Sequence, residues 1–385
     1  MRSRKRVAMA AGLPLALAII AYAAGHDYMR GAAFVVQAAG MTGMARTVAE
    51  WQTTGVTEER LTIPWRDGTL PARRYLPASG HRRVFLLTPG VHASGVEEPR
   101  LVGFARELAS MGHAVVTIGP PDLARYSINT RATDAIEDAA RWLGQQRDLA
   151  PDGHIGLMGI SFAGGLSIVA AGRPSIRDTV SFVVSLGGHA DLPRTLRYLC
   201  TGDEPGSPHQ PPHDYGVVII LLGVVDRVVP EDQVAGLREG VLTFLEASRL
   251  DLIDKAKSLA EFEHAKVLGA SLPEPARTVM GYVNARDVAH LGPLLLPHVQ
   301  AMGGDPALSP ALSPPPSARV FLLHGTGDNV IPAAESIQLA RTLTERRVPV
   351  ELLVTPLITH AEVDQMSDVR DVLRLIAFWS AVLGE

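Results

Sequence analysis

Short apolar runs alternate with longer amphipathic segments along most of the chain. Apolar runs such as residues 83–88 and 318–324 lack period-two alternation, which is typical of strands buried on both faces of a parallel sheet. Because strands and amphipathic helices follow one another, the pattern predicts an α/β fold: a mostly parallel sheet with helices on both faces. The predicted strands are residues 57–65, 69–75, 83–88, 114–118, 154–158, 181–186, 318–324 and 350–355, and the predicted helices are residues 99–110, 130–146, 166–171, 333–346 and 362–383.

Two features depart from this alternation. The first two predicted strands are separated by Arg66-Asp67-Gly68, a turn signal, so the fold is predicted to open with a β-hairpin. From residue 190 to residue 317 no parallel-strand pattern recurs, and helix-like stretches take its place, the longest over residues 233–260. We therefore expect residues 57–189 and 318–385 to form the core, and residues 190–317 to form a mainly helical lid over the carboxyl ends of the strands.

The N-terminal segment has the pattern of a membrane anchor or a signal peptide. Basic residues between Arg2 and Arg6 precede residues 7–24, which carry no charge. As a helix this apolar run is about 27 Å long, close to the thickness of the bilayer hydrocarbon. We predict a signal-anchor or transmembrane segment over residues 1–30, with the rest of the chain on the non-cytoplasmic side of the membrane. Secretion after cleavage is the alternative, because Ala21-Tyr22-Ala23 resembles a signal-peptidase site. Residues 31–56 are predicted to form a helical spacer.

Composition and charge restrict the function. The 385 residues are 46% hydrophobic and 20% charged, which is typical of a folded globular chain with a large core. The formal net charge is −4, and the basic residues cluster only near the N-terminus, so no nucleic-acid partner is expected. The single cysteine, Cys200, excludes an intrachain disulfide. No motif surrounds Cys200, so a small buried side chain is expected there.

Ser161 is the candidate nucleophile. It follows a predicted strand and precedes a predicted helix, so it is expected at a sharp corner between the two. Such a nucleophile elbow needs small residues two positions before and after the serine, and Gly159 and Ala163 meet that need. The amide of Phe162 would then lie at a helix N-terminus, where backbone donors favour negative charge. Phe162 is therefore a candidate oxyanion donor.

A serine hydroxyl needs a base to become a nucleophile, and the base needs a carboxylate to orient it. Asp328 is predicted in a glycine-rich loop directly after a buried strand, and His360 follows the last predicted strand. No other histidine comes after Asp328, so His360 is the base if Asp328 is the acid. Asp226 and Asp191 are alternatives for the acid. The apolar residues before Asp226 resemble a capped helix of the lid, which favours Asp328.

Three motifs in this order resemble those of the α/β-hydrolase superfamily, of the esterase, lipase and dienelactone-hydrolase kind. They are Gly159-Ile160-Ser161-Phe162-Ala163, the loop from Gly325 to Pro332, and Thr359-His360. The resemblance implies a catalytic triad of Ser161, Asp328 and His360. It also implies a second oxyanion donor in the loop that begins Thr88-Pro89-Gly90, which we assign to the amide of Val91. His92 is the alternative donor, because this loop lacks the His-Gly pair of many relatives.

The resemblance implies a serine hydrolase that cleaves a carboxylic ester or related acyl bond through an acyl-enzyme. A peptidase or thioesterase on the same scaffold is one alternative, and a catalytically silent, membrane-tethered binding protein is another. The expected partners are a small-molecule or lipid-like acyl substrate and, through the N-terminal helix, the membrane. No cofactor or metal is expected, since His209 and His213 lie among prolines without further ligands nearby.

Overall fold

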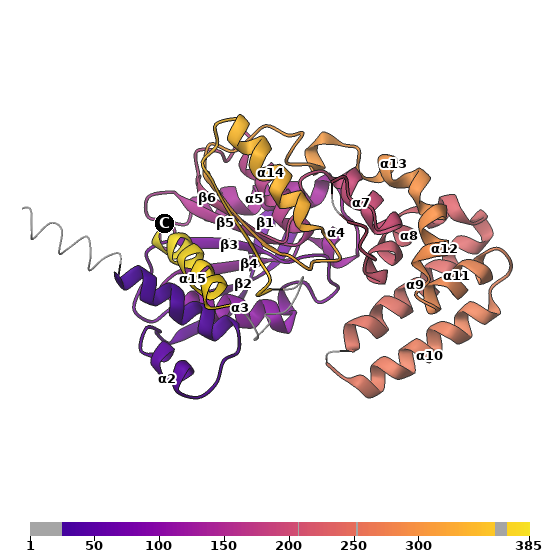
Figure 1. Cartoon of the computed structure of the whole chain (residues 1–385), viewed down its shortest axis with the longest axis horizontal. Coiled ribbons are helices and arrows are strands. Elements are labelled where there is room, and N and C mark those ends of the chain that lie inside the picture. Colours follow the sequence, from indigo (N-terminus) through magenta and orange to yellow (C-terminus); the bar gives the residue numbers. More distant parts are fainter. Residues whose placement is uncertain (1–24, 207, 252, 359–367) are drawn as a thin grey trace, which may run out of the picture.

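The computed structural model describes residues 25–206, 208–251, 253–358 and 368–385 (Figure 1). Within this part of the chain, eight strands form one sheet in the order β1-β2-β4-β3-β5-β6-β7-β8. β1 pairs antiparallel with β2, and β2 with β4, whereas the other neighbours are parallel. The strands are β1 (Val56–Trp65), β2 (Gly68–Pro77), β3 (Val84–Thr88), β4 (Ala114–Ile118), β5 (Ile155–Ile160), β6 (Val180–Leu186), β7 (Arg319–Gly325) and β8 (Val350–Thr355). This mostly parallel sheet confirms the predicted α/β-hydrolase-like fold.

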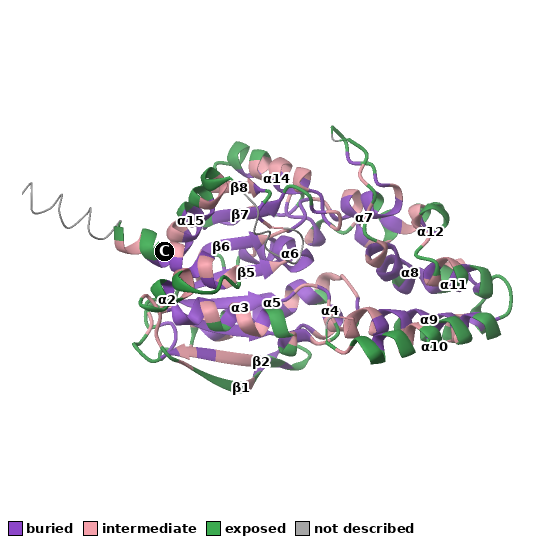
Figure 2. Ribbon diagram, turned by 60° about the horizontal axis from the view of Figure 1, so that its bottom comes forward, coloured by how far each residue is buried: buried purple, intermediate pink, exposed green. Residues whose placement is uncertain are grey.

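The burial of each strand follows from its place in the sheet. β3 and β4 lie inside the sheet, and all their residues are buried, as their uninterrupted apolar sequences predict. β1 lies at the edge and is largely exposed (Figure 2). The predicted hairpin is also confirmed, because Trp65 pairs with Gly68 across a two-residue turn. Gly68 has a φ of 120°, which glycine adopts without the steric cost that a side chain would bring.

Helices cover both faces of the sheet. The helix over residues 25–38 packs with α3 (Pro99–Ser110) and α15 (Val369–Gly384) against one face. The other face is covered by α5 (Thr130–Gly144), α6 (Phe162–Ala171) and α14 (Ala333–Glu345). Side-chain caps fix where two of these helices begin: Glu98 accepts from the Leu101 amide at the start of α3, and Asn129 accepts from the Ala132 amide at the start of α5. The shorter elements nearby are α2 (Met44–Glu50), α4 (Pro121–Ala124) and the 3-10 turn η1 (Gly95–Glu97).

The helix over residues 25–38 is bound to the core. The ring of Phe34 is fully buried and lies 4.5 Å, centroid to centroid, from that of Trp379 on α15. Arg30 is also buried, and its guanidinium contacts the Met111 carbonyl and lies 2.9 Å from His113 Nε2. None of the described helices is both long and apolar enough to cross a membrane. Of the predicted anchor over residues 1–30, residues 1–24 lie outside the described part, whereas residues 25–30 belong to the helix that packs on the core.

The chain between β6 and β7 is mainly helical and extends beyond one end of the core (Figures 1 and 2). The prediction of one long helix over residues 233–260 is wrong, because the chain turns back after Leu250. Asp254 then caps a new helix by accepting a hydrogen bond from the Lys257 amide, so α9 and α10 form a helical hairpin. The helices here are α7 (Leu192–Thr201), α8 (Asp214–Val228), α9 (Glu231–Leu250), α10 (Lys255–Ser271), α11 (Ala276–Asn284), α12 (Val288–Leu295) and α13 (Val299–Gly303).

The connectivity of the sheet determines where a ligand can bind. β3 lies between β4 and β5 in the sheet. The chain therefore leaves β3 toward β4 on one side and later returns to form β5 on the other side. The loops after β3 and β5 therefore lie beside each other at the carboxyl ends of their strands. In open α/β sheets this switch point is the usual site of ligand binding.

Candidate active site

Ser161 lies at the corner between β5 and α6, as the sequence predicts. Its backbone has φ 57° and ψ −134°, a conformation that residues other than glycine rarely adopt. A hydrogen bond of 2.7 Å from the Ser161 amide to the Leu186 carbonyl helps to hold this conformation. The side chain is 8% exposed, at the edge of the sheet where ligands are expected. A strained serine fixed at this edge has the geometry of a nucleophile elbow.

The small residues around Ser161 are required by close packing. A Cβ atom added to Gly159 would overlap the carbonyl group of Ala163 and lie 2.6 Å from Ser167 Oγ. One added to Gly165 would lie 2.6 Å from His189 Nδ1. Helix α6 can therefore approach β5 and the segment after β6 only because these positions lack side chains. The same close packing holds the helix N-terminus, with the Phe162 amide, directly behind the serine.

The loop after β3 lies against Ser161. A Cβ atom added to Gly90 would be 3.1 Å from Ser161 Cβ and 3.7 Å from Ser161 Oγ. The next residue, Val91, is buried, and its carbonyl accepts a hydrogen bond of 3.4 Å from the Tyr215 hydroxyl of α8. Burial lowers the pKa of His92, whose Nδ1 accepts from the Ser94 amide. The assignment of the Val91 amide as second oxyanion donor stays a prediction; the structure shows that its neighbour Gly90 packs against Ser161.

Asp328 is held firmly in the loop after β7. It is 2% exposed, and its Oδ1 accepts hydrogen bonds of 2.9 Å from the amides of Val330 and Ile331. Its Oδ2 lies 3.4 Å from Nε2 of His324, a fully buried residue of β7. A carboxylate fixed in this way can orient a neighbouring imidazole. His360 belongs to residues 359–367, which lie outside the described part, so its role as base stays a prediction.

The alternative acids occupy different surroundings. Asp226 is exposed on α8, the helix that the apolar residues before it predict. Asp191 caps α7 by accepting a hydrogen bond of 3.0 Å from the Arg194 amide.

Cys200 is buried, which raises its pKa to about 12 and agrees with an unreactive thiol. Among the described residues, no cluster of three or more histidine, cysteine or acidic side chains could hold a metal ion.

His324 was not identified from the sequence, although it lies only four positions before Asp328. Its Nε2 lies 2.8 Å from the Ile331 carbonyl, and its Nδ1 lies 2.6 Å from the Ser336 hydroxyl. Since a carbonyl oxygen can only accept, Nε2 carries a proton and donates it to the Ile331 carbonyl. His324 thus bridges the loop of Asp328 and the start of α14. The sequence feature that could have identified His324 is its position as a histidine at the end of an otherwise apolar strand.

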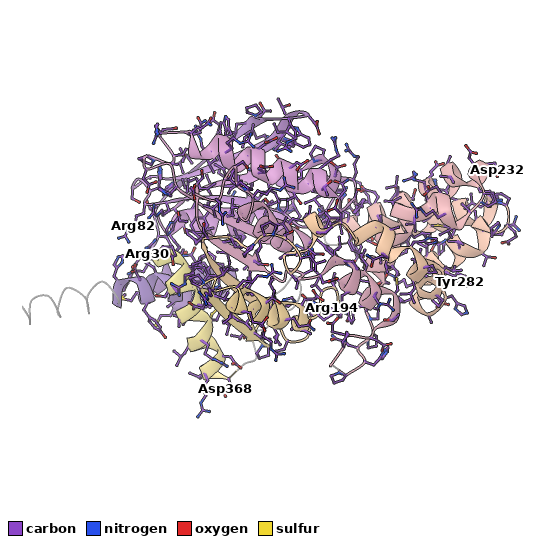
Figure 3. The ribbon with its side chains drawn as sticks, turned by 90° about the horizontal axis from the view of Figure 1, so that it is seen from above. Arg30, Arg82, Arg194, Asp232, Tyr282 and Asp368 are labelled. Atoms are coloured by element: carbon purple, nitrogen blue, oxygen red, sulfur yellow. The ribbon has the colours of Figure 1, made fainter. Side chains whose placement is uncertain are left out.

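A second set of residues missed in the sequence joins the lid to the core. Glu335 of α14 is fully buried and accepts hydrogen bonds from the amides of Ala190 and Asp191, at 2.7 and 2.9 Å. Its Oε1 also accepts from Arg194 Nε at 2.5 Å, where the lid meets the core (Figure 3). Burial and the nearby Glu335 raise the pKa of Glu204, 4% exposed, to about 7. The Arg194 guanidinium, 3.3 Å from Glu204, opposes this shift.

The raised pKa of Glu204 predicts a pH-dependent stability. Its folded-state pKa of about 7 exceeds the ordinary value of 4.5, so the folded protein binds more protons between these pH values. The free energy of unfolding should therefore fall as pH rises from about 4.5 to 7, and the loss should persist above pH 7. Glu204→Gln should remove this penalty and raise stability at pH 8 by up to about 3 kcal/mol, with little change at pH 4. Urea unfolding at both pH values measures it.

Glu345→Gln, at an exposed position on α14, provides the matched control for Glu204→Gln. It removes the same charge from the surface, so its unfolding free energy should follow the wild-type pH profile. Parallel pH profiles for Glu204→Gln and the wild-type protein would show that Glu204 does not titrate with a raised pKa.

Comparisons with known proteins give one family match and several similar solved structures. Residues 307–385 match the model of the prolyl oligopeptidase family. Among solved structures, the chain is similar to an esterase from Pyrobaculum calidifontis at 18% identity, with 86% of this chain and 88% of that chain covered and a TM-score of 0.47. It is also similar to an acylaminoacyl peptidase from Pyrococcus horikoshii, at 14% identity over 86% of this chain and 46% of that chain, with a TM-score of 0.43. A dienelactone hydrolase from Anabaena variabilis gives 14% identity, coverages of 85% and 96%, and a TM-score of 0.41. A comparison with curated proteins found no match.

The sheet and the serine at the corner after β5 define an α/β-hydrolase-like fold, and the family match over residues 307–385 agrees with it. The matched residues 307–385 contain the end of the core, from β7 to α15, and include Asp328. It is this C-terminal segment that is similar to the prolyl oligopeptidase family. The predicted superfamily is thereby confirmed, and the family match supports a hydrolase of the α/β-hydrolase type.

Proposed function

We propose that the chain is a serine hydrolase that cleaves a carboxylic ester through an acyl-enzyme. The observation that carries the proposal is the strained backbone of Ser161 at the β5-α6 corner, with Gly90 packed against its side chain. Ser161 attacks the substrate carbonyl, and His360 takes its proton and later gives it to the leaving group. Asp328 orients the imidazole of His360.

The developing negative charge on the carbonyl oxygen is stabilised in the proposed mechanism by the amides of Phe162 and Val91. Each such donor contributes about 3 kcal/mol to transition-state stabilisation in related chemistry. The two amides come from the loops after β5 and β3, which the sheet order brings to one edge. A donor from each loop can therefore approach the same oxygen atom without any movement of the sheet.

A peptidase is the second candidate, and the match of residues 307–385 to the prolyl oligopeptidase family favours it. Both reactions use the same nucleophile and acyl-enzyme, so they differ only in the leaving group. A panel of p-nitrophenyl esters and peptide p-nitroanilides of the same acyl group separates them. We expect the esters to be cleaved with the higher kcat/KM.

The test of the proposed function is covalent labelling. The full chain, kept intact because the helix over residues 25–38 packs on the core, should react with a fluorophosphonate at a stoichiometry near one. Mass spectrometry should locate the label on Ser161, and short p-nitrophenyl esters should be hydrolysed until the label is complete. A folded protein that neither takes the label nor cleaves the esters would contradict the proposal and favour the silent binding protein.

A further inference from the structure

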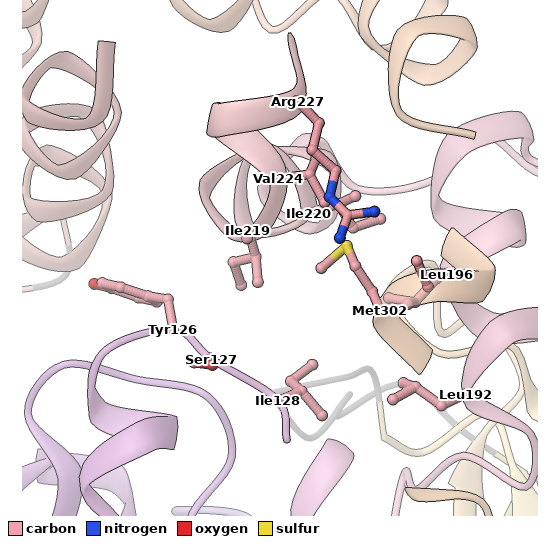
Figure 4. A pocket seen from close by; sticks show the side chains of 12 residues that line it. Tyr126, Ser127, Ile128, Leu192, Leu196, Ile219, Ile220, Val224, Arg227 and Met302 are labelled. Atoms are coloured by element: carbon pink, nitrogen blue, oxygen red, sulfur yellow. The ribbon is translucent and has the colours of Figure 1, made fainter. Parts of the chain in front are cut away.

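A pocket of about 200 Å³ lies between the core and α8 (Figure 4). The core contributes residues 126–128, and the other side of the pocket is formed by α7, α8 and α13. Its walls are mainly aliphatic and sulfur-containing side chains. These include Ile128, Leu192, Leu196, Ile219, Ile220 and Met302. Such walls favour a hydrocarbon chain over a polar ligand.

Arg227 is the exception to this apolar lining. It is the one charged side chain among the described residues that line the pocket, and it lies near the C-terminal end of α8. Figure 4 shows its guanidinium beside Met302, directed toward the other lining residues. No acidic side chain in the described part of the chain lies within ion-pair distance of Arg227. A guanidinium that is exposed, has no carboxylate partner among the described residues, and lies at the end of an apolar pocket can bind the carboxylate of a ligand.

Residues at the Tyr126 end of the pocket make contacts that lead to the loop beside Ser161. Tyr126 lines the pocket, and its ring lies edge-on to that of Tyr215, at 6.2 Å between centroids. The Tyr215 hydroxyl contacts the carbonyl of Val91, which directly follows the glycine packed on Ser161. Tyr126 has a φ of 61°, a strained conformation of the kind that collects at functional sites. The Tyr126 end of the pocket is thus two side-chain contacts away from the loop that lies against Ser161, and the proposal below places the acyl chain along this route.

The length of α8 sets the size of the ligand. Tyr215 and Arg227 are twelve residues apart on α8, which is kinked at Val224, so they are separated by less than the roughly 18 Å of a straight helix of this length; the part from Tyr215 to Val224 alone spans about 13 Å. A ligand that reaches from the neighbourhood of Ser161 to Arg227 must therefore contain a long apolar chain. A short acyl group would fill only the end near Tyr126 and would leave the guanidinium without a partner.

We propose that this pocket binds the acyl chain of an ester whose far end carries a carboxylate, and that Arg227 pairs with that carboxylate. The substrate class is thus a monoester of a long-chain dicarboxylic acid. This inference rests on the proposed function of Ser161, and it adds a preference for one kind of acyl group. The aliphatic walls select the chain, and the single cation selects its charged end.

The experiment compares p-nitrophenyl esters of dicarboxylic acids with neutral esters of the same chain length. For the wild-type full chain, the terminal carboxylate should raise kcat/KM by about 10- to 100-fold, the effect of one charge-assisted hydrogen-bonded pair. This increase should occur only for chains long enough to reach Arg227. Short dicarboxylic monoesters should show no advantage over their neutral counterparts.

Variants at residue 227 test whether the guanidinium causes the preference. Arg227→Gln should bring the ratio of the two kcat/KM values for long chains to about one. Arg227→Glu should reverse the preference, so that a long-chain ester ending in an ammonium group becomes the better substrate. Arg197→Gln provides the matched control, because Arg197 is an exposed arginine of the lid helix α7 that does not line the pocket. It should retain the wild-type ratio.

Failure of this inference can be distinguished from failure of the proposed function. If short neutral esters are cleaved and Ser161 is labelled, but long dicarboxylic monoesters show no advantage, the role of the pocket is overturned and the hydrolase stands. The same conclusion follows if Arg227→Gln keeps the advantage. Calorimetry supplies a readout without turnover: Ser161→Ala protein should bind a long-chain dicarboxylate monoester, and the added change Arg227→Gln should weaken this binding about tenfold or more.

Discussion

Replacing Ser161 with alanine is expected to lower kcat for ester hydrolysis by about 10⁴- to 10⁶-fold, because a serine triad without its nucleophile loses nearly all of its chemistry. Alanine keeps the Cβ atom, so the corner between β5 and α6 and its packing should be preserved. The measurement is turnover of a short p-nitrophenyl ester by the full chain, compared with the uncatalysed rate. A loss of less than about tenfold would show that another residue is the nucleophile.

Ser167→Ala is the matched control for this variant. Ser167 lies on the same helix, α6, and is also buried, but no role in the reaction is proposed for it. Its replacement should leave kcat near the wild-type value. If Ser167→Ala also abolished turnover, the loss in the Ser161 variant would reflect damage to α6 and not the removal of the nucleophile.

The same assay tests the proposed base. His360→Ala should cost nearly as much as Ser161→Ala, and the two changes together should cost little more than either alone. Members of a triad act as one unit, so their effects are far from additive. A wild-type rate for His360→Ala would exclude this histidine as the base and leave the partner of Asp328 to be found elsewhere.

Much of the fold could be predicted because it depends on local patterns. The strands over residues 114–118 and 350–355 and the helix over residues 99–110 have the predicted bounds, since each is a continuous apolar or amphipathic run with clear ends. The corner at Ser161 was also predictable, because the requirement for Gly159 and Ala163 is visible in the sequence. The break between α9 and α10 was not predicted, although Asp254 is a residue type that commonly caps the start of a helix.

The parts of the site that could not be predicted depend on contacts between distant segments. Arg227 and Tyr126 line one pocket only because α8 folds back over the core. The pairing of Glu335 with Arg194 joins positions that are 141 residues apart. Neither the spacing nor the type of these residues distinguishes them from ordinary surface residues. The burial of Glu335 and the position of Arg227 beside an apolar pocket appear only in three dimensions.

Replacing Glu335 with alanine is expected to lower the free energy of unfolding by about 3 to 5 kcal/mol, because it removes a fully buried carboxylate and leaves the partly buried Arg194 guanidinium with Glu204 as its remaining carboxylate partner. The two Oε2 contacts, with the amides of Ala190 and Asp191, would be lost as well. Glu335→Gln keeps one oxygen that can still accept either from the two backbone amides or from Arg194. The free energy of unfolding should therefore fall by less, about 1 to 3 kcal/mol. Urea unfolding at pH 7 measures both.

Glu351→Ala is the control that shows whether the loss of stability in Glu335→Ala is due to the burial of Glu335. Glu351 of β8 forms an ion pair of 2.6 Å with Arg319, but both side chains are partly exposed, so its removal should cost less than about 1 kcal/mol. Equal costs for Glu335→Ala and Glu351→Ala would mean that water reaches Arg194, and that this contact does not fix the start of the lid to the core.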